Sequence, residues 1–296
     1  MSTATTATQP LPARIRRTPG PIRVVLIVVV IGYAIFAIGS GVVALLAVAA
    51  RHTFTAHSTF AGVHRLIVDN SVGDVHLVRA RAGAPVSLTA HVTEGLGNPR
   101  RTAQRSAGGT LRLSASCANV FVGPSCDVGY TVAVPTGVRV GIESSGGDIT
   151  VRDYVGRTPL SLSSSAGDIN ASGITVPSLQ LDSSAGDVRA DAIRAPVVHA
   201  ESSAGDVVLQ LSAAPRTLTA ESSAGDVRLT VPDQVYRVKA SSSAGSVTDG
   251  DIRQSPRAPH SIEASSSAGD VTIAPPGPSA TSRPARRRPR ASPRGS

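Results

Sequence analysis

The chain has 296 residues, enough for one or two domains, and 41% of them are hydrophobic while only 3% are aromatic. Val, Leu, Ile, Ala and Ser must therefore build the core, which suits thin β-layers and excludes a thick, aromatic-rich globular centre. The net charge of +9 belongs to the two ends, because residues 58–274 hold 18 basic and 20 acidic residues. The basic character is thus not a property of the folded part.

The first 50 residues predict a membrane anchor. Residues 1–22 are rich in Thr, Pro and Arg, and we expect a disordered, basic, cytoplasmic segment. Residues 23–50 are predicted to form one transmembrane helix, because residues 24–50 are a run of 27 residues without a charge. About 20 apolar residues are enough to span a bilayer.

Arginines flank this run unequally, which predicts its orientation. Arg51 and Arg65 are the only cationic residues soon after the run, whereas four precede it: Arg14, Arg16, Arg17 and Arg23. The positive-inside rule then places the N-terminus in the cytoplasm and the bulk of the chain outside the cell membrane. The alternative is a cleaved signal peptide, since "AVA" at residues 47–49 has the pattern of a cleavage site. An apolar run longer than about 7–15 residues favours the uncleaved anchor.

The two cysteines, Cys117 and Cys126, bracket the segment "ANVFVGPS". Outside the cytoplasm such a pair is most simply a disulfide that closes a surface loop. A metal site would need more ligands, and no His lies nearby. A loop this short limits the stabilisation from the bond to roughly 2–3 kcal/mol.

A linker at residues 51–59 leads to an extracytoplasmic β-repeat domain, which we place at residues 60–274. Its N-terminal strands are indicated by alternating apolar and polar residues in "VHRLIVDNSVGDVHLVRA", with a turn at Gly73 and Asp74, and in "PVSLTAHVTE", "TLRLSAS" and "GYTVAVP". Regular repeats occupy residues 138–274. The Arg- and Pro-rich tail at residues 275–296 is low in complexity and is expected to be disordered.

One short phrase occurs seven times, for example as "ESSAGDVVLQL" at residues 201–211 and "ESSAGDVRLTV" at residues 221–231. Ser246 takes the place of Asp in the sixth repeat and so interrupts the row. The other six repeats supply the aspartates Asp148, Asp168, Asp187, Asp206, Asp226 and Asp270. The spacings are 20, 19, 19, 20, 20 and 24 residues. A period near 20 predicts a β-solenoid, and the last gap predicts a surface loop around "DGDIRQSPRAPH".

The alternation of apolar residues within a repeat predicts two short strands per coil. Val198, Ala200 and Ser202 share one parity before the Gly-Asp pair, and Val207 and Leu209 share the opposite parity after it. A strand cannot change parity without a corner or an extra residue, so Ala-Gly-Asp is the predicted corner. The glycine supplies the backbone freedom that a corner needs.

Repetition is first a way to fold. Ordering a coil costs about 1–2 kcal/mol per residue in backbone entropy, and each buried aliphatic side chain returns roughly 1.5–3 kcal/mol. One coil alone is therefore unstable, whereas stacked coils bury each other's faces. A column of serines also faces inward: Ser144, Ser164, Ser183, Ser202, Ser222, Ser242 and Ser266. Because a buried hydroxyl without a partner costs about 1–3 kcal/mol, we expect these hydroxyls to bond the backbone or each other.

The Ser-Ser-x-Gly-Asp-(Val/Ile) repeats, preceded by "VAVPTGVRVGIESSGGDITV", resemble the bacterial "putative adhesin" or toastrack family of Gly-Asp β-strand-repeat ectodomain proteins. The resemblance covers roughly residues 60–274. It implies an extracytoplasmic β-solenoid, often on a membrane anchor and associated with envelope-stress modules. It brings no catalytic residues.

A row of aspartates is the feature of the sequence best suited to bind a ligand or a metal ion. Its members are Asp148, Asp168, Asp187, Asp206 and Asp226. Unit charges about 4.8 Å apart repel each other, so such a row needs compensation. The favoured interpretation is that each carboxylate caps its own turn by accepting backbone N–H groups. The alternative is a row of metal sites, since hard divalent cations prefer carboxylate oxygens.

Two further surfaces are charged. Glu143, Asp182, Glu201 and Glu221 have outward parity and form an acidic row, either a solvated face or a ligand-binding one. Arginines in the tail, by contrast, could bind anionic wall polymers or lipid head groups, with nucleic acid the less favoured target. These are Arg283, Arg286, Arg287, Arg288 and Arg290. A merely soluble tail is the competing interpretation.

The seven His residues show no metal-ligand spacing, and the sequence contains no nucleophile elbow, phosphate loop or cofactor motif. We therefore expect no enzyme and no cofactor. The favoured function is a single-pass, non-enzymatic β-solenoid at the bacterial cell envelope that binds or scaffolds. The alternative is an envelope-stress sensing or signalling component that acts through protein partners.

Overall fold

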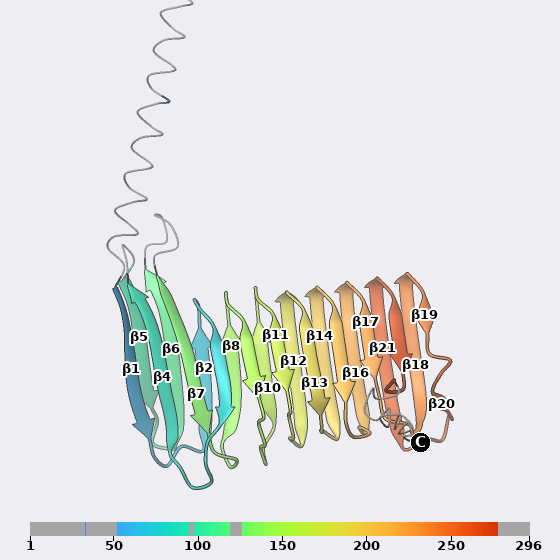
Figure 1. Ribbon diagram of the computed structural model, residues 1–296, viewed down its shortest axis with the longest axis horizontal. Coiled ribbons are helices and arrows are strands. Elements are labelled where there is room, and N and C mark those ends of the chain that lie inside the picture. The colour runs from blue at the N-terminus through green and yellow to red at the C-terminus, as the bar shows by residue number, and fades with distance from the viewer. Residues whose placement is uncertain (1–32, 34–51, 95–97, 119–125, 278–296) are drawn as a thin grey trace, which may run out of the picture. The chain divides into compact units, whose positions relative to one another are not determined.

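The computed structural model describes Tyr33 and residues 52–94, 98–118 and 126–277 (Figure 1). The chain divides into the units Met1–Ala49 and Ala50–Ser296, and all the strands described below belong to the second. Except for Tyr33, the predicted segments at residues 1–22 and 23–50 lie outside the described residues, as do residues 278–296 of the tail. None of the helical structure that can be described is long and apolar enough to cross a membrane.

The second unit is built from two β-sheets of 11 strands each. In spatial order, sheet A consists of β1 (His52–Phe60), β4 (Val86–Glu94), β7 (Asp127–Val134), β3 (Val75–Arg79), β9 (Ile149–Arg152), β11 (Ile169–Ser172), β13 (Val188–Ile193), β15 (Val207–Leu211), β17 (Val227–Thr230), β22 (Val271–Ala274) and β19 (Val247–Thr248). Sheet B consists of β20 (Arg253–Gln254), β18 (Val235–Ala244), β21 (His260–Ala268), β16 (Thr217–Ala224), β14 (Val197–Ala204), β12 (Ser178–Ala185), β10 (Leu160–Ser164), β8 (Arg139–Ser144), β2 (Arg65–Asn70), β6 (Thr110–Ala118) and β5 (Asn98–Arg105).

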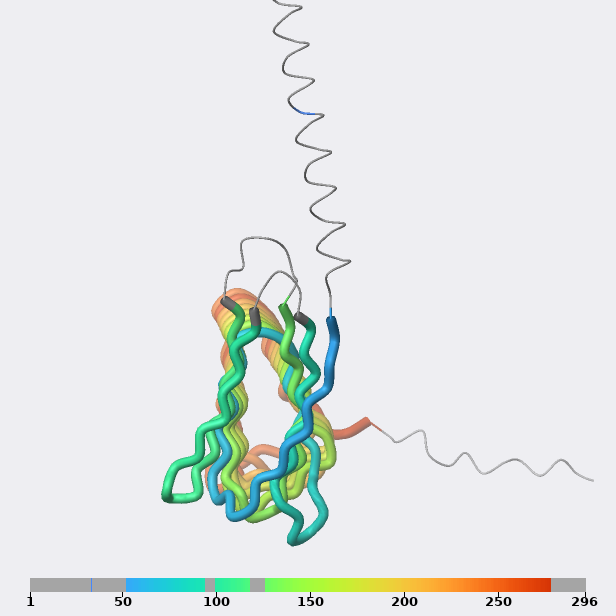
Figure 2. The backbone as a smooth tube through the Cα atoms, turned by 90° about the vertical axis from the view of Figure 1, so that its left-hand side faces the viewer, coloured from blue at the N-terminus to red at the C-terminus, as the bar shows by residue number. Residues whose placement is uncertain are grey.

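Each coil contributes one strand to each sheet, and like residues stack on like. In sheet B, Val198 of β14 lies beside Leu218 of β16 in parallel register, and Ala200 lies beside Ala220. The backbones of the two sheets face each other (Figure 2). Their inward positions form one core, mainly of buried Val, Leu, Ile and Ala side chains together with Tyr130, Tyr154 and Tyr236. The all-β fold and the stacked two-strand coils that the period of 20 predicts are confirmed.

Six of the seven repeats have a corner glycine with a positive φ, for example 153° at Gly205; Gly245 of the outermost coil is the exception. A Cβ atom at Gly205 would lie 2.3 Å from the carbonyl oxygen of Gly186 in the neighbouring coil. Any side chain here would therefore be strained by its backbone conformation and would also clash with a backbone atom. The corner that the change in parity predicts lies at this point, and stacking as well as turning requires glycine there.

The coils do not stack in chain order, which corrects the expectation that Ser246 interrupts the row. The last coil, β21–β22, lies between β16–β17 and β18–β19, so the sixth repeat, with Ser246, is the outermost coil (Figure 1). The longer spacing of 24 residues between Ser246 and Asp270 gives the chain enough length to return past the outermost coil before it forms the last coil. The predicted loop "DGDIRQSPRAPH" contains β20, the edge strand of sheet B, which pairs with β18 at Val235 and Tyr236.

The other end shows the same arrangement. The first coil, β2–β3, lies between the coil β6–β7 and the coil β8–β9. Three antiparallel pairings, β1 with β4, β4 with β7 and β5 with β6, complete this end of the two sheets. The predicted strands around the Gly73–Asp74 turn are thus β2 and β3, and they join the regular stack by parallel pairing with β8 and β9.

Candidate functional site

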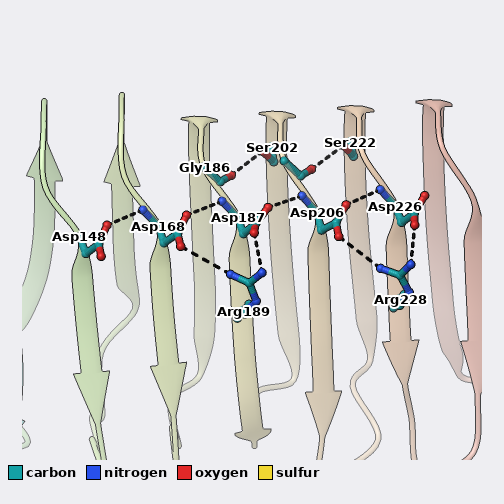
Figure 3. A network of polar contacts seen from close by, with 11 residues as sticks. Asp148, Asp168, Gly186, Asp187, Arg189, Ser202, Asp206, Ser222, Asp226 and Arg228 are labelled. Carbon is teal, nitrogen blue, oxygen red and sulfur yellow. Dashed lines mark hydrogen bonds and ion pairs between the residues drawn. The ribbon is translucent and has the colours of Figure 1, made fainter.

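The corner aspartates form one continuous row of bonds between coils, here called the aspartate ladder (Figure 3). The backbone N–H of Asp168 donates to Asp148 Oδ1 at 2.8 Å, and the N–H of Asp187 donates to Asp168 Oδ1 at 2.8 Å. Asp206 and Asp226 repeat the bond at 2.7 Å and 2.8 Å. The carboxylates do accept backbone N–H groups, but the donor belongs to the neighbouring coil and not to the same turn.

The ladder is longer than the sequence indicates. It begins at Asp74, whose Oδ1 accepts the N–H of Asp148 at 2.9 Å, and Asp270 continues it by donating to Asp226 Oδ1 at 2.8 Å. Ser246 ends it, because both its N–H and its hydroxyl donate to Asp270 Oδ1. The outermost coil needs a donor but no carboxylate, which explains the one departure from the Gly-Asp pattern.

Two arginines each bridge two neighbouring ladder carboxylates and so offset part of their charge. Arg189 lies 3.5 Å from Asp168 Oδ2 and also contacts Asp187, and Arg228 lies 3.3 Å from Asp206 Oδ2 and also contacts Asp226 (Figure 3). The backbone hydrogen bond from Asp206, together with Arg189, holds the pKa of the Asp187 carboxyl below its ordinary value despite partial burial. A cation that bound these oxygens would have to compete with existing bonds, so the geometry favours a structural role.

The serine column bonds to backbone in the neighbouring coil, as the burial of hydroxyls requires. Ser202 Oγ donates to the Gly186 carbonyl and Ser222 Oγ to the Gly205 carbonyl, both at 2.9 Å (Figure 3). The pattern changes where the regular repeats meet the first coil. There Ser144 donates to Gly147 of its own coil, and the buried hydroxyl of Ser164 has no hydrogen-bond partner.

Of the acidic row that the sequence predicts on the outside, the structure brings three members together. Asp182, Glu201 and Glu221 face each other on the adjacent strands β12, β14 and β16, while Ser163 separates Asp182 from Glu143. His199 lies beside Asp182 and Glu201, with Nε2 3.7 Å from an oxygen of each. The sequence pattern does not show this contact, because it joins neighbouring coils. Only the 19-residue period brings residues 182 and 201 side by side.

Two sets of predicted residues remain, the cysteines and the tail arginines. Cys117, near the end of β6, and Cys126, just before β7, form a disulfide bond with their Cα atoms 6.2 Å apart. The tail arginines Arg283, Arg286, Arg287, Arg288 and Arg290 lie outside the described residues.

Each coil has two strands that meet at a corner glycine, and hydrogen bonds between aspartates connect one coil to the next. Such a stack of coils defines the protein as a β-solenoid. The profile of the family described as Toastrack DUF4097 matches residues 63–282, and the chain belongs to this family. This confirms the resemblance carried by the Ser-Ser-x-Gly-Asp repeats. A search of the curated proteins gives no match.

Solved structures of bacterial proteins are similar to this chain at low identity. A "putative adhesin" from Bacteroides fragilis is 18% identical over 76% of this chain and 97% of its own, with a TM-score of 0.48. A "putative lipid binding protein" from Parabacteroides distasonis is 12% identical over 76% and 97%, with a TM-score of 0.43. A "putative cell adhesion protein" from Clostridium sporogenes is 12% identical over 76% and 100%, with a TM-score of 0.38.

Proposed function

We propose that the protein is a single-pass, non-enzymatic β-solenoid, anchored in the bacterial cell membrane and displayed outside the cytoplasm to bind or scaffold other molecules. Three features support the location: the 27-residue uncharged run at residues 24–50, the arginines before it, and the disulfide between Cys117 and Cys126. A structural disulfide persists in an oxidising compartment, which agrees with a domain outside the cytoplasm.

The observation that carries the binding role is the regular outer face of sheet B. Strands β10, β12, β14 and β16 pair in parallel, in register, so their outward side chains form straight rows across the sheet. The ladder, by contrast, uses its polar groups to hold the coils together. Enzyme sites need groups that converge in a concave pocket. A sheet face with aligned side chains fits contact with an extended partner better than catalysis.

The location is tested with a cysteine introduced at the exposed position Ser203. The two natural cysteines are bonded to each other, so Ser203→Cys supplies a free thiol. An impermeant thiol reagent should label the variant in intact cells once any wall is made permeable. Labelling that occurs only after lysis would place the β domain in the cytoplasm and overturn the proposal.

The binding role is tested by photo-cross-linking in the same cells. A photo-reactive residue at Gln180 reports on the outer face of sheet B, and one at Gln210 reports on the outer face of sheet A; both side chains are exposed. The photo-reactive residue at Gln180 should give cross-linked products with partner molecules, and the one at Gln210 should give fewer. Equal or no cross-linking from both positions would contradict binding through sheet B. The identity of the partners would separate a scaffold from a sensing component.

A further inference from the structure

Three potential metal ligands converge on the outer face of sheet B. Asp182 comes from β12, and His199 and Glu201 come from β14. One ligand atom from each residue lies within 4.8 Å of the other two. From this geometry we propose that Asp182, His199 and Glu201 form a binding site for a divalent transition-metal ion such as Zn²⁺.

The fold fixes this arrangement through strand register. Gln180 pairs with His199, and Asp182 pairs with Glu201, in the parallel ladder between β12 and β14. Residues two apart on a strand point to the same face, so His199 and Glu201 both project outward beside Asp182. The ligands therefore stand on the rigid backbone of two neighbouring coils and not on a loop.

The distances suit a shared ion better than direct hydrogen bonds. His199 Nε2 lies 3.7 Å from Asp182 Oδ1 and 3.7 Å from Glu201 Oε2. Hydrogen bonds between nitrogen and oxygen measure about 2.7–3.2 Å. Two ligand atoms bound to a tetrahedral zinc ion at about 2.0–2.2 Å lie about 3.3–3.6 Å apart. Small side-chain rotations would bring the three atoms onto one ion.

Local charge also favours a cation at this place. Asp182, Glu201 and Glu221 face one another on three adjacent strands, and within the part of the chain that is described neither Arg nor Lys forms an ion pair with Asp182 or Glu201. The ladder carboxylates Asp168 and Asp187, by contrast, share Arg189. The carboxylates of Asp182 and Glu201, which are paired across β12 and β14, therefore repel each other. A bound cation would relieve this repulsion.

The chemistry of the ligands selects the class of ion. An imidazole nitrogen suits zinc, copper or nickel, whereas calcium and magnesium prefer oxygen ligands alone. Gln180 Nε2 donates to Asp182 Oδ2 at 2.9 Å, which fixes the carboxylate and leaves Oδ1 on the side of His199. Such a bond from a neighbouring residue is the usual support for a metal ligand. The half-exposed site leaves room for water as a fourth ligand.

This inference goes beyond the proposed display at the envelope, because binding of an ion requires neither a membrane nor a partner. The experiment uses the full chain, purified in detergent and freed of metal by a chelator, and measures Zn²⁺ binding by calorimetry. We expect one site, removed by His199→Gln and weakened at least tenfold by Asp182→Asn. Both side chains point outward, so neither change removes a core contact, and the melting temperature without metal should not change.

Matched controls are available on the same face. Glu143→Gln and Glu263→Gln alter outward carboxylates that are not part of the three-residue group, and both should bind Zn²⁺ like the unaltered chain. Cobalt offers a second readout, because Co²⁺ in a tetrahedral site with a nitrogen ligand should give visible absorption that His199→Gln abolishes. Zn²⁺ binding that persists in His199→Gln, or its absence from the unaltered chain, would overturn the proposal.

Discussion

At the scale of single residues, the first Ser, the Gly and the Asp of the Ser-Ser-Ala-Gly-Asp phrase each contact the neighbouring coil. Ser202 donates to a glycine carbonyl in that coil. Gly205 leaves space for another glycine carbonyl, and Asp206 donates its N–H to an aspartate. Because every partner is itself part of the phrase, a change in one coil disturbs two. The phrase is repeated because each copy supplies bonding partners for the copies on either side of it.

The serine column predicts opposite effects for two similar substitutions. Ser202→Ala removes the donor to the Gly186 carbonyl and should cost about 1 kcal/mol of unfolding free energy. Ser164→Ala removes a buried hydroxyl that has no partner, so stability should stay the same or rise by up to about 1 kcal/mol. Urea unfolding of the two variants measures both. Equal losses would show that the hydroxyl of Ser164 is bonded after all.

Replacement of a corner glycine should cause a large loss of folding stability. Gly205→Val places a β-branched side chain at φ 153° and its Cβ 2.3 Å from the Gly186 oxygen. We expect a loss of at least about 2 kcal/mol in the free energy of unfolding, because strain and clash add. Gly141→Val is the matched control, since no atom lies within 4 Å of a Cβ built there. A melting temperature for Gly205→Val equal to that of the control would remove the corner assignment.

At the scale of elements, local patterns in the sequence predicted what lies within one coil. The change of parity between Ala200 and Val207 located the corner, and inward serines such as Ser222 were expected to bond the backbone. Contacts between coils were harder to predict, because they depend on the order in which coils stack. Three findings follow from that order. The last coil lies beside β16–β17, and Ser246 ends the ladder. His199 meets Asp182 of the neighbouring coil.

The ladder predicts no response to calcium. Asp206 Oδ1 accepts the N–H of Asp226, and Oδ2 lies near Arg228, so a hard cation would have to compete with a partner at each oxygen. Millimolar Ca²⁺ should leave the melting temperature unchanged. Asp206→Asn should cost about 1 kcal/mol or less, because the amide oxygen still accepts the backbone bond and the lost ion pair is half exposed.

The cation interpretation of Asp148, Asp168, Asp187, Asp206 and Asp226 predicts the reverse. Binding would stabilise the folded chain by about 2.7 kcal/mol at a hundred times the dissociation constant. Asp206→Asn would remove that gain and would relieve repulsion in the metal-free chain. A rise in melting temperature with Ca²⁺ that Asp206→Asn abolishes would therefore contradict the structural role.

At the scale of the whole β domain, the first and the last coil both lie inside the stack. The first coil, β2–β3, and the last coil, β21–β22, each have a coil on either side. Neither can separate without breaking two sets of strand pairings. A solenoid stacked in chain order would instead leave its last coil at the edge, where loss of one set of pairings would release it. The observed order therefore holds the first and last coils between neighbours, and the outermost coil at one end is β18–β19.

Hydrogen exchange distinguishes the two orders. Both edges of β21 are paired, with β16 and β18, whereas β18 pairs with β20 only at Val235 and Tyr236 along its outer edge. Amides in residues 260–274 should thus exchange as slowly as those in β16 and β17, although they are the last strands of the domain. Amides in residues 237–248 should exchange faster, because opening an edge coil exposes less core and breaks fewer bonds. Mass spectrometry of the full chain in detergent measures both segments. Rapid exchange in residues 260–274 with protection of residues 237–248 would mean that the coils stack in chain order and that Ser246 does interrupt the ladder.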